Sequence, residues 1–562
     1  MALRAADTVL LRTARRTPGS LIVATLAGIA SGVAELLLPD TTAHAVDLAL
    51  AGHTRLTDFS PLLAVIIAVA VTNAVYQATA ARLTALGTAW LRERLTSTLL
   101  GLRPASPGLA AGDAVSRLTG DCALAGAAAG TVAQLVLVAL TSIGAIVALT
   151  LLGWWLALVF AISLPITLLL ARGHVRRTES SLADYRTFSG ELAARLLDAT
   201  TGIRTIAATG TADSETERVL RPLPHLAKAG LDMWRAQARM AWRAALLLPG
   251  VQLAMLGAAG YGVLTGRLTA GGLLAALGYS GMGMGLVGAI ALLTTLATAR
   301  AAAERIVEAD NLPRRKGGTT ALPAGPGTLV LRGVTVRAED GTPTLSGIDL
   351  TVPAGATVAL VGKSGAGKTT LAEVAGGLRA PDAGTVSLDG VNLATIHPDA
   401  LRSAFGHAFD RPHLLGETVA EAIAQGTDAD LDTITTAARA AQVDDAIVRL
   451  PHGYRTPLAD APMSGGEAQR IGLARALVRG PRVLVLDDAT ASLDTVTEER
   501  VTNAIRTSLP GHTRLVSTHR ISIAEQADLV VWLAGGQVRA FARHDELWQF
   551  PGYRAVFTEA RG

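Results

Sequence analysis

The 562-residue sequence is poor in charged residues, in aromatic rings and in cysteine. Charged residues make up 17% of the chain, whereas average soluble proteins carry about 25%. The single cysteine, Cys122, excludes a disulfide scaffold and a cysteine-based zinc site. The formal net charge is +4, which is too small to indicate nucleic acid as a partner.

Half of the residues are hydrophobic, and they are unevenly distributed. Long runs of Ala, Leu, Val and Gly occupy residues 17–300, whereas residues 326–562 have the composition of an ordinary α/β domain. The high apolar content excludes a disordered chain. A purely soluble protein is also disfavoured, so we expect a multi-domain membrane protein.

The apolar part contains segments long enough to cross a bilayer, which takes about 20 mostly apolar residues in a helix. We predict an all-α transmembrane domain over residues 20–308, preceded by an amphipathic interfacial helix over residues 1–19. Glu35 lies inside the first span and is either functional or snorkels to the outer interface. The predicted spans are 20–39, 60–80, 128–152, 154–172, 244–265 and 272–299.

Arginine placement predicts the orientation of these spans. Arg12, Arg15 and Arg16 precede the first span, and further arginines follow the second, fourth and sixth, whereas the opposite loops hold little beyond Arg55 and Arg267. The positive-inside rule then places both termini in the cytoplasm. We expect a multi-pass protein of the cell inner (cytoplasmic) membrane, with the lipid bilayer as one partner.

A Pro/Gly-rich linker, residues 309–327, precedes a second domain over residues 328–562. There the apolar run Thr357–Val361 leads into a complete G-x-x-x-x-G-K-[ST] loop placed between a strand and a helix. Its backbone N–H groups are suited to phosphate, Lys368 to the β- and γ-phosphates, and Thr369 to Mg²⁺. We therefore predict an α/β P-loop ATPase domain that binds ATP and Mg²⁺ through Gly362, Lys363, Ser364, Gly365, Ala366, Gly367, Lys368, Thr369 and Thr370.

Two further motifs follow in the same domain. The buried strand pattern Val483–Asp487 ends in a carboxylate that is suited to Mg²⁺. Ser464, Gly465, Gly466 and Glu467 open a helix and so form a second anion-binding helix start. One nucleotide cannot use both starts of the same subunit, so we predict that the second serves a nucleotide held by a partner subunit.

The order of these motifs, with Ser517-Thr-His519 after them, resembles the ATPase of ABC transporters. Six spans ahead of it resemble an exporter-type half-transporter, which implies a helical subdomain and a second half-transporter as partner. The resemblance implies catalytic roles for Asp488 and His519. It places Asp410 at the Q-loop glutamine position, as a catalytic residue and, with Thr369 and Asp487, a metal ligand. The implied substrate is hydrophobic, amphipathic or peptide-like.

The sequence departs from the family pattern at several positions, which include Glu467 in place of the usual glutamine of the signature. Ala338 stands where an aromatic ring usually stacks on adenine, Asp410 replaces the glutamine, and Asp488 replaces the glutamate that polarises water. Asp488 is one methylene shorter, and a 1 Å misplacement can cost about 10²-fold in rate. Ser464–Gly466 and His519 are kept.

This pattern favours a heterodimer in which the chain's own Walker site binds ATP but hydrolyses it slowly, while its signature motif completes the partner's competent site. A homodimer with two slow sites stays open. So do an exporter-fold importer of siderophore-like compounds and an ATP-gated regulatory membrane subunit.

Overall fold

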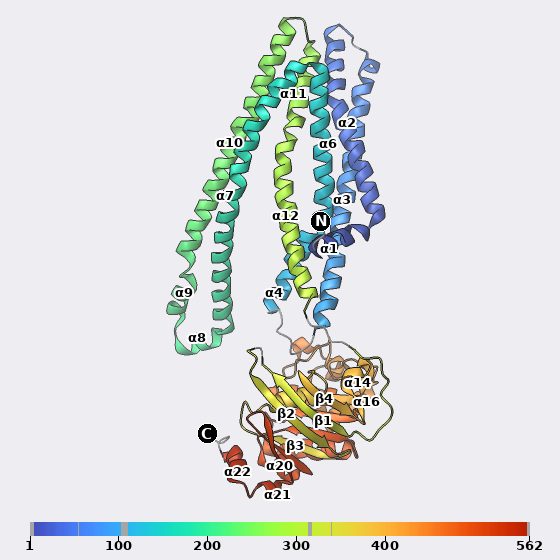
Figure 1. Cartoon of the computed structure of the whole chain (residues 1–562), viewed down its shortest axis with the longest axis vertical. Coiled ribbons are helices and arrows are strands. Elements are labelled where there is room, and N and C mark those ends of the chain that lie inside the picture. Colours follow the sequence, from blue (N-terminus) through green and yellow to red (C-terminus); the bar gives the residue numbers. More distant parts are fainter. Residues whose placement is uncertain (1–4, 54, 103–110, 313–316, 339, 559–562) are drawn as a thin grey trace. The chain divides into compact units, whose positions relative to one another are not determined.

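The computed structural model describes residues 5–53, 55–102, 111–312, 317–338 and 340–558. The chain divides into two compact units, one made of residues 1–100 and 109–311 and the other of residues 101–108 and 312–562. The first is helical and the second is α/β (Figure 1). The predicted fold class, a helical transmembrane domain with an α/β nucleotide-binding domain, is confirmed.

The helical unit consists of long helices together with a few short ones. In chain order they are α1 (Ala5–Arg15), α2 (Pro18–Leu50), α3 (Ser60–Leu100), α4 (Ala111–Ser116), α5 (Cys122–Gly126), α6 (Ala128–Leu152), α7 (Trp154–Thr201), α8 (Ile203–Thr209), α9 (Ala212–Leu220), α10 (Leu223–Leu264), α11 (Ala270–Gly283) and α12 (Gly285–Asp310). A π-helical turn, Arg117–Asp121, joins α4 to α5.

Apolar stretches long enough to cross a membrane are found in the described residues over Pro18–Leu50, Leu56–Leu100, Gly112–Leu152 and Ala270–Asp310. The predicted spans 154–172 and 244–265 lie in α7 and α10, where many side chains lie outside the described residues. Large apolar side chains such as Leu26, Val71 and Ile143 are exposed on these helices, as expected for surfaces that face lipid.

The long helices α7 and α10 run side by side and are joined at one end by α8 and α9 (Figure 1). At 48 and 42 residues, both are about twice the length needed to cross a bilayer. Each helix therefore extends well beyond its predicted span.

Small residues allow close helix contacts near α11. A Cβ at Gly271 would lie 2.1 Å from the carbonyl oxygen of Ala43 on α2, and one at Gly283 would lie 2.7 Å from the ring of Phe160. Close backbone approach of this kind is typical of membrane helices. The predicted span 272–299 lies within the apolar stretch Ala270–Asp310, in which a single turn residue, Met284, separates α11 from α12.

Glu35 lies in α2 and accepts a hydrogen bond from Ser31 Oγ, one turn earlier, at 3.2 Å. The helix thus supplies a local partner for this carboxylate. A contact within one helix does not assign a functional role to Glu35.

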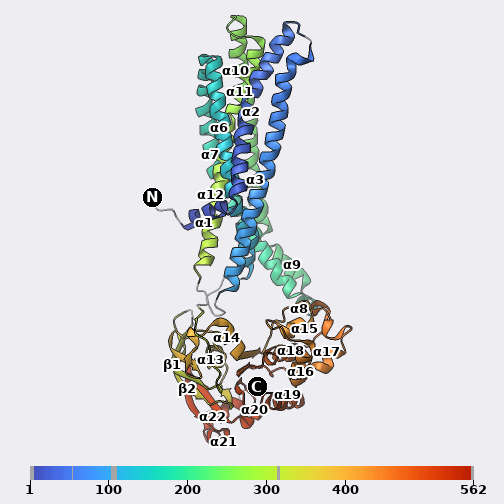
Figure 2. The same ribbon diagram turned by 90° about the vertical axis from the view of Figure 1, so that its right-hand side faces the viewer.

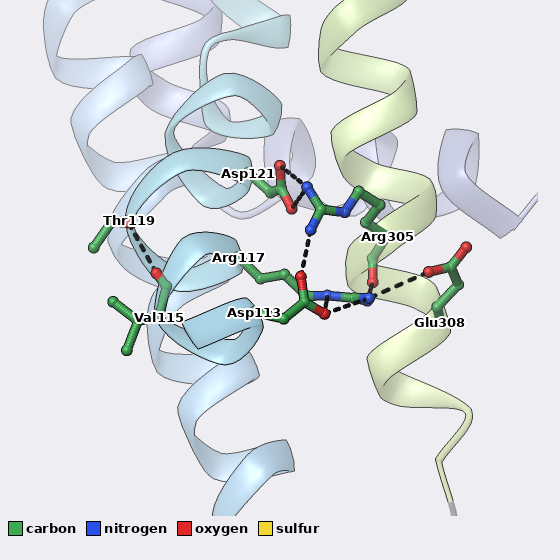
Figure 3. Close-up of polar contacts among 7 residues, drawn as sticks. All are labelled: Asp113, Val115, Arg117, Thr119, Asp121, Arg305 and Glu308. Atoms are coloured by element: carbon green, nitrogen blue, oxygen red, sulfur yellow. Dashed lines mark hydrogen bonds and ion pairs between the residues drawn. The ribbon is translucent and has the colours of Figure 1, made fainter. Parts of the chain in front are cut away.

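A charged cluster ties the end of α12 to the α4–α5 segment (Figure 3). Arg117 is buried and pairs with Asp113 at 3.0 Å and with Glu308 of α12 at 3.4 Å. Arg305 of α12 pairs with Asp113 and, at 3.1 Å, with Asp121. Pairing in a network satisfies arginines that would be costly to leave unpaired in a partly buried place.

The α/β unit contains two sheets among its described residues. An antiparallel sheet has the order β2-β1-β4-β5, and a larger sheet has the order β10-β9-β3-β8-β7-β6, in which only β10 is antiparallel to its neighbour. The strands are β1 (Leu329–Arg337), β2 (Pro343–Val352), β3 (Thr357–Val361), β4 (Ala383–Leu388), β5 (Val391–Asn392), β6 (Phe405–Phe409), β7 (Val483–Asp487), β8 (Thr513–Ser517), β9 (Leu529–Ala534) and β10 (Gln537–Ala542).

Helices cover the larger sheet and form a subdomain beside it. Figure 2 shows α15 to α18 gathered on the side of this unit away from β1 and β2. Val419, Ile434 and Leu473 of these helices share a core with residues of β6 and β7. The helices of this unit are α13 (Lys368–Ala375), α14 (Pro398–Ala404), α15 (Val419–Ala424), α16 (Leu431–Ala440), α17 (Asp444–Val448), α18 (Gly465–Leu477), α19 (Thr495–Ser508), α20 (Ile521–Gln526), α21 (His544–Leu547) and α22 (Pro551–Thr558).

Candidate functional site

The glycine-rich loop lies between the buried strand β3 and helix α13. Gly365 and Gly367 adopt φ values of +77° and +100°, which favour glycine over any residue with a Cβ. A Cβ at Gly367 would also lie 2.8 Å from the side chain of Leu345. Backbone strain and packing therefore both require glycine at this position, as expected for a loop whose N–H groups converge on phosphate.

Lys368 lies at the first position of α13 and is buried. Its Nζ donates hydrogen bonds to the carbonyl oxygens of Gly362, at 2.9 Å, and Lys363, at 3.3 Å. Burial lowers the pKa of this ammonium, and the nearby carboxylates Asp488 and Asp487 oppose that effect. The ammonium is thus held within the loop, where phosphate oxygens would replace the carbonyls as better partners.

Two oxygen ligands suited to a divalent cation lie together beside the loop. Thr369 Oγ1 donates a hydrogen bond to Asp487 Oδ1 at 3.2 Å. Burial raises the pKa of the Asp487 carboxyl, and the hydrogen bond from Thr369 opposes this rise. A hydroxyl and a carboxylate are hard oxygen ligands of the kind that Mg²⁺ prefers. The residues present therefore fit the predicted cation.

Asp488 and His519 follow the ends of β7 and β8, which are adjacent parallel strands. The His519 Nε2 atom lies 3.8 Å from Asp488 Oδ2. Asp488 has a φ of +47°, an uncommon conformation that fixes where its short side chain starts. Burial, and next the charge of Lys368, lower the pKa of His519, whereas the charge of Asp488 opposes this shift.

Asp410 directly follows β6 and is held by the helical subdomain. Gln469 Nε2 donates hydrogen bonds to Asp410 Oδ1 at 2.9 Å and to its carbonyl oxygen at 2.6 Å. The nearest cation, Arg411, lies 3.8 Å from the carboxylate. Among the contacts of the described residues, Asp410 reaches neither Thr369 nor Asp487, so its role as a metal ligand stays a prediction.

The second helix start opens α18 and is exposed. Ser464 is its N-cap and forms a reciprocal capping box with Glu467. The Ser464 N–H and hydroxyl both donate to Glu467 Oε2, at 2.8 Å and 2.9 Å. These hydrogen bonds, from the Ser464 N–H above all, lower the pKa of Glu467, so its carboxylate is charged at neutral pH.

Ala338 follows β1 and closes a tight turn. Its N–H donates to the carbonyl oxygen of Thr342 at 2.8 Å, and its methyl group is exposed. A methyl group offers no ring face to adenine. The structure thus places a short turn where the resemblance predicts a stacking platform.

Two residues that sequence reasoning missed, Gln469 and Arg520, connect parts of the site. Gln469 is buried and also accepts a hydrogen bond from the N–H of Ser492 at 3.2 Å. Arg520 pairs with the buried Glu498 at 2.9 Å and donates to the carbonyl oxygen of Leu493 at 2.7 Å. In the sequence, these residues could have been found only by their position: Gln469 lies beside the signature motif, and Arg520 follows His519.

Known proteins resemble both units of the chain. The family model described as ABC transporter transmembrane region matches residues 21–287, and the model described as ABC transporter matches residues 345–491. The ABC transporter ATP-binding protein RamA of Streptomyces coelicolor is 45% identical over 474 residues, which are 83% of this chain and 74% of that protein.

A fatty acid ABC transporter ATP-binding/permease protein of Mycobacterium tuberculosis is 30% identical over 455 residues, 80% of this chain and 72% of that protein. The solved structure of a bacterial Atm1-family ABC exporter with ATP bound has the same fold, with a TM-score of 0.78 and 23% identity over 98% of each chain. The matches cover the helical unit and the α/β unit alike, and the chain therefore belongs to the ABC transporters, as a half-transporter that carries a transmembrane domain and an ATP-binding domain on one polypeptide.

Proposed function

We propose that the chain is the subunit of a heterodimeric ABC exporter that carries the hydrolysis-impaired site. ATP-binding domains of this family bind ATP, normally with Mg²⁺, and couple its hydrolysis to transport. In our proposal this chain binds ATP at its own Walker site without hydrolysing it at an appreciable rate. Its signature motif completes a competent site on the partner.

Binding of ATP is supported by the donors around the glycine-rich loop. Lys368, whose Nζ is held by a carbonyl oxygen of the loop, and the loop N–H groups would bind phosphate, and Thr369 and Asp487 would hold Mg²⁺. Mg²⁺ bound there would offset the negative charge of the β- and γ-phosphates. This chain's part is to bind the nucleotide and keep its phosphates oriented toward the partner.

The length and position of the Asp488 side chain are the main support for impaired hydrolysis. The proposal rests on this observation. The shorter side chain starts from a backbone in the left-handed region and ends 3.8 Å from His519. The methylene that a glutamate would supply is not present to carry the carboxylate toward the γ-phosphate. Small misplacements of a general base are costly, so slow turnover at this site follows.

The exposure of the signature motif supports its role in completing the partner's ATP site. Ser464 and Gly465 are exposed in the chain alone, and the helix start they form attracts anions. A nucleotide held by a second half-transporter would cover them. The same polypeptide thus combines a weak Walker site with an intact signature, a combination that suits a heterodimer.

The proposed substrate is a hydrophobic, amphipathic or peptide-like compound that leaves the cytoplasm. The relative named as a fatty acid transporter supports an apolar substrate. The arginine pattern supports insertion into the cytoplasmic membrane with both termini inside. Movement out of the cell would then follow closure of the two ATP-binding domains.

Phosphate release tests this proposal. The full-length chain is reconstituted alone in nanodiscs and compared with the complex that a tag on this chain retains from its native membrane. We expect slow ATP turnover by the chain alone, fast turnover by the complex, and a second half-transporter in the complex by mass spectrometry. In inside-out vesicles, the complex should accumulate an amphipathic fluorescent probe only with ATP.

A homodimer gives the opposite result. If the chain alone hydrolyses ATP briskly and Asp488→Asn stops it, the heterodimer is wrong and Asp488 is a working catalytic carboxylate. ATP-driven release of the probe from loaded inside-out vesicles would contradict export. ATP turnover without any movement of the probe or of related compounds would favour the regulatory subunit.

A further inference from the structure

The signature helix start is occupied by a side chain of its own helix. Both hydrogen-bond donors of Ser464, its N–H and its hydroxyl, are directed to one oxygen of the Glu467 carboxylate. Ser464 Oγ also accepts from the Glu467 N–H, at 3.3 Å. The N–H and the hydroxyl of Ser464 are thus both engaged by Glu467.

A carboxylate at this place competes with phosphate. Helix starts stabilise an anion because their N–H groups are unpaired and the helix dipole is positive there. Glu467 supplies such an anion from within the chain, and its charge is stabilised by Ser464. A neutral glutamine would make a capping box of the same shape but would not repel an arriving γ-phosphate.

The same helix offers the carboxylate a second partner. Arg470 lies three residues after Glu467, on the same face of α18, and its charge helps to lower the pKa of Glu467. Within the described part of the chain, the buried Nε of Arg470 has no hydrogen-bond partner. A change of rotamer at Glu467 would move the carboxylate from Ser464 toward this guanidinium.

We propose that Glu467 is an internal stand-in for the partner's γ-phosphate, which must leave Ser464 for Arg470 before the nucleotide sandwich closes. Glu467 thereby sets the ATP concentration at which the two domains close. This inference rests on the proposed function, because it requires that the signature meets a nucleotide held by a second subunit. It concerns the competition at Ser464, not the identity of the partner.

The test compares Glu467→Gln with the unaltered chain in the full-length complex, retained through a tag on this chain. The measured quantity is the ATP concentration that gives half-maximal phosphate release, at low salt and at high salt. We expect Glu467→Gln to lower this concentration about fivefold at low salt, which corresponds to about 1 kcal/mol. The difference should shrink at about 0.3 M salt, because salt screens charge repulsion at an exposed site.

Arg470→Met tests the second position of the carboxylate. We expect this substitution to raise the half-maximal ATP concentration when Glu467 is present. In the Glu467→Gln background the same change should have a much smaller effect, because a neutral amide gains little from the guanidinium. A double-mutant cycle isolates this coupling from any general loss of stability, and thermal unfolding of each variant shows whether the fold is kept.

Glu421→Gln is the matched control. Glu421 is an exposed glutamate at the corresponding position of α15, where its N–H donates to the N-cap hydroxyl of Thr418 and its carboxylate accepts from the N–H of Glu417. Removing its charge should leave the half-maximal ATP concentration unchanged. If both variants shift the half-maximal ATP concentration equally, the effect comes from the overall charge of the protein, and the proposal is wrong.

Failure of this inference and failure of the proposed function give different results. If Ser464→Arg abolishes ATP turnover while Glu467→Gln behaves like the unaltered chain at every salt concentration, the competition is wrong and the signature role stands. If Ser464→Arg leaves turnover intact, the signature does not complete a competent site, and the proposed function itself is wrong.

Discussion

The two helix starts of the ATP-binding domain, before α13 and before α18, have opposite surroundings. At the first, Lys368 is buried and held by carbonyl oxygens of its own loop, next to two carboxylates. At the second, Ser464 is exposed and its donors point to Glu467. The first has the residues of a phosphate site within one chain, whereas the donors of the second are occupied by a carboxylate of its own helix.

In the proposed heterodimer, this difference would assign the first start to the chain's own nucleotide and the second to the partner's nucleotide. A buried cation beside fixed glycines is prepared for a ligand, because little reorganisation is needed when phosphate arrives. An exposed helix start capped by its own carboxylate needs another surface to become a site. Mutations at the two starts should therefore affect different nucleotides, and the following experiments test that expectation in order of effect.

The largest effect is expected from Lys368→Ala. It removes the cation that the loop holds for phosphate, so photo-cross-linking of an azido-ATP analogue to this chain should be abolished. Lys228→Ala removes the same charge from an exposed place in the helical unit and should leave labelling unchanged. Undiminished labelling of the Lys368→Ala chain would mean that the nucleotide binds elsewhere.

Ser464→Arg should abolish nearly all ATP turnover of the complex while azido-ATP labelling of this chain persists. The bulky side chain blocks the surface that faces the partner's nucleotide but lies outside the glycine-rich loop. Ser508→Arg introduces the same side chain at the exposed end of α19 and serves as the control. If Ser464→Arg abolishes azido-ATP labelling as well as ATP turnover, the two helix starts do not serve different nucleotides.

Gln469→Leu should lower stability and turnover moderately. The buried amide bridges Asp410 and the N–H of Ser492, and its loss leaves both groups without that partner. Hydrogen bonds to charged groups contribute about 1.5–3 kcal/mol, which predicts a lower midpoint of thermal unfolding. Gln526→Leu, at an exposed position, should leave the midpoint unchanged.

The smallest effect is expected from Asp488→Asn in the complex. Turnover should fall little, because the aspartate side chain is already too short to position water well. Asp488→Glu restores the missing methylene and should raise phosphate release. If the asparagine variant of the complex loses most of its turnover, the two nucleotide sites are more alike than we propose.

Much of the fold follows from local pattern, which explains why the sequence predicted it. Long apolar runs allow little besides membrane helices, and the glycine-rich loop requires a strand before it and a helix after it. Predicted ends are less accurate, because a membrane helix can continue into water: α3 runs to Leu100, whereas the predicted second span ends at residue 80. The single turn residue Met284 between α11 and α12 was not predicted, since no proline marks it.

The sequence by itself determined the family, the two domains and the residues suited to phosphate and Mg²⁺, because these depend on residue type and spacing along one strand, turn or helix. Only the tertiary structure decided which of them meet. Thr369 and Asp487 are distant in sequence and come together at 3.2 Å because β3, β8 and β7 are adjacent parallel strands. The contact of Asp410 with Gln469, in place of a contact with Thr369 or Asp487, likewise depends on how the helical subdomain packs against β6. No local pattern encodes that packing, since it is set by the shared core of distant segments.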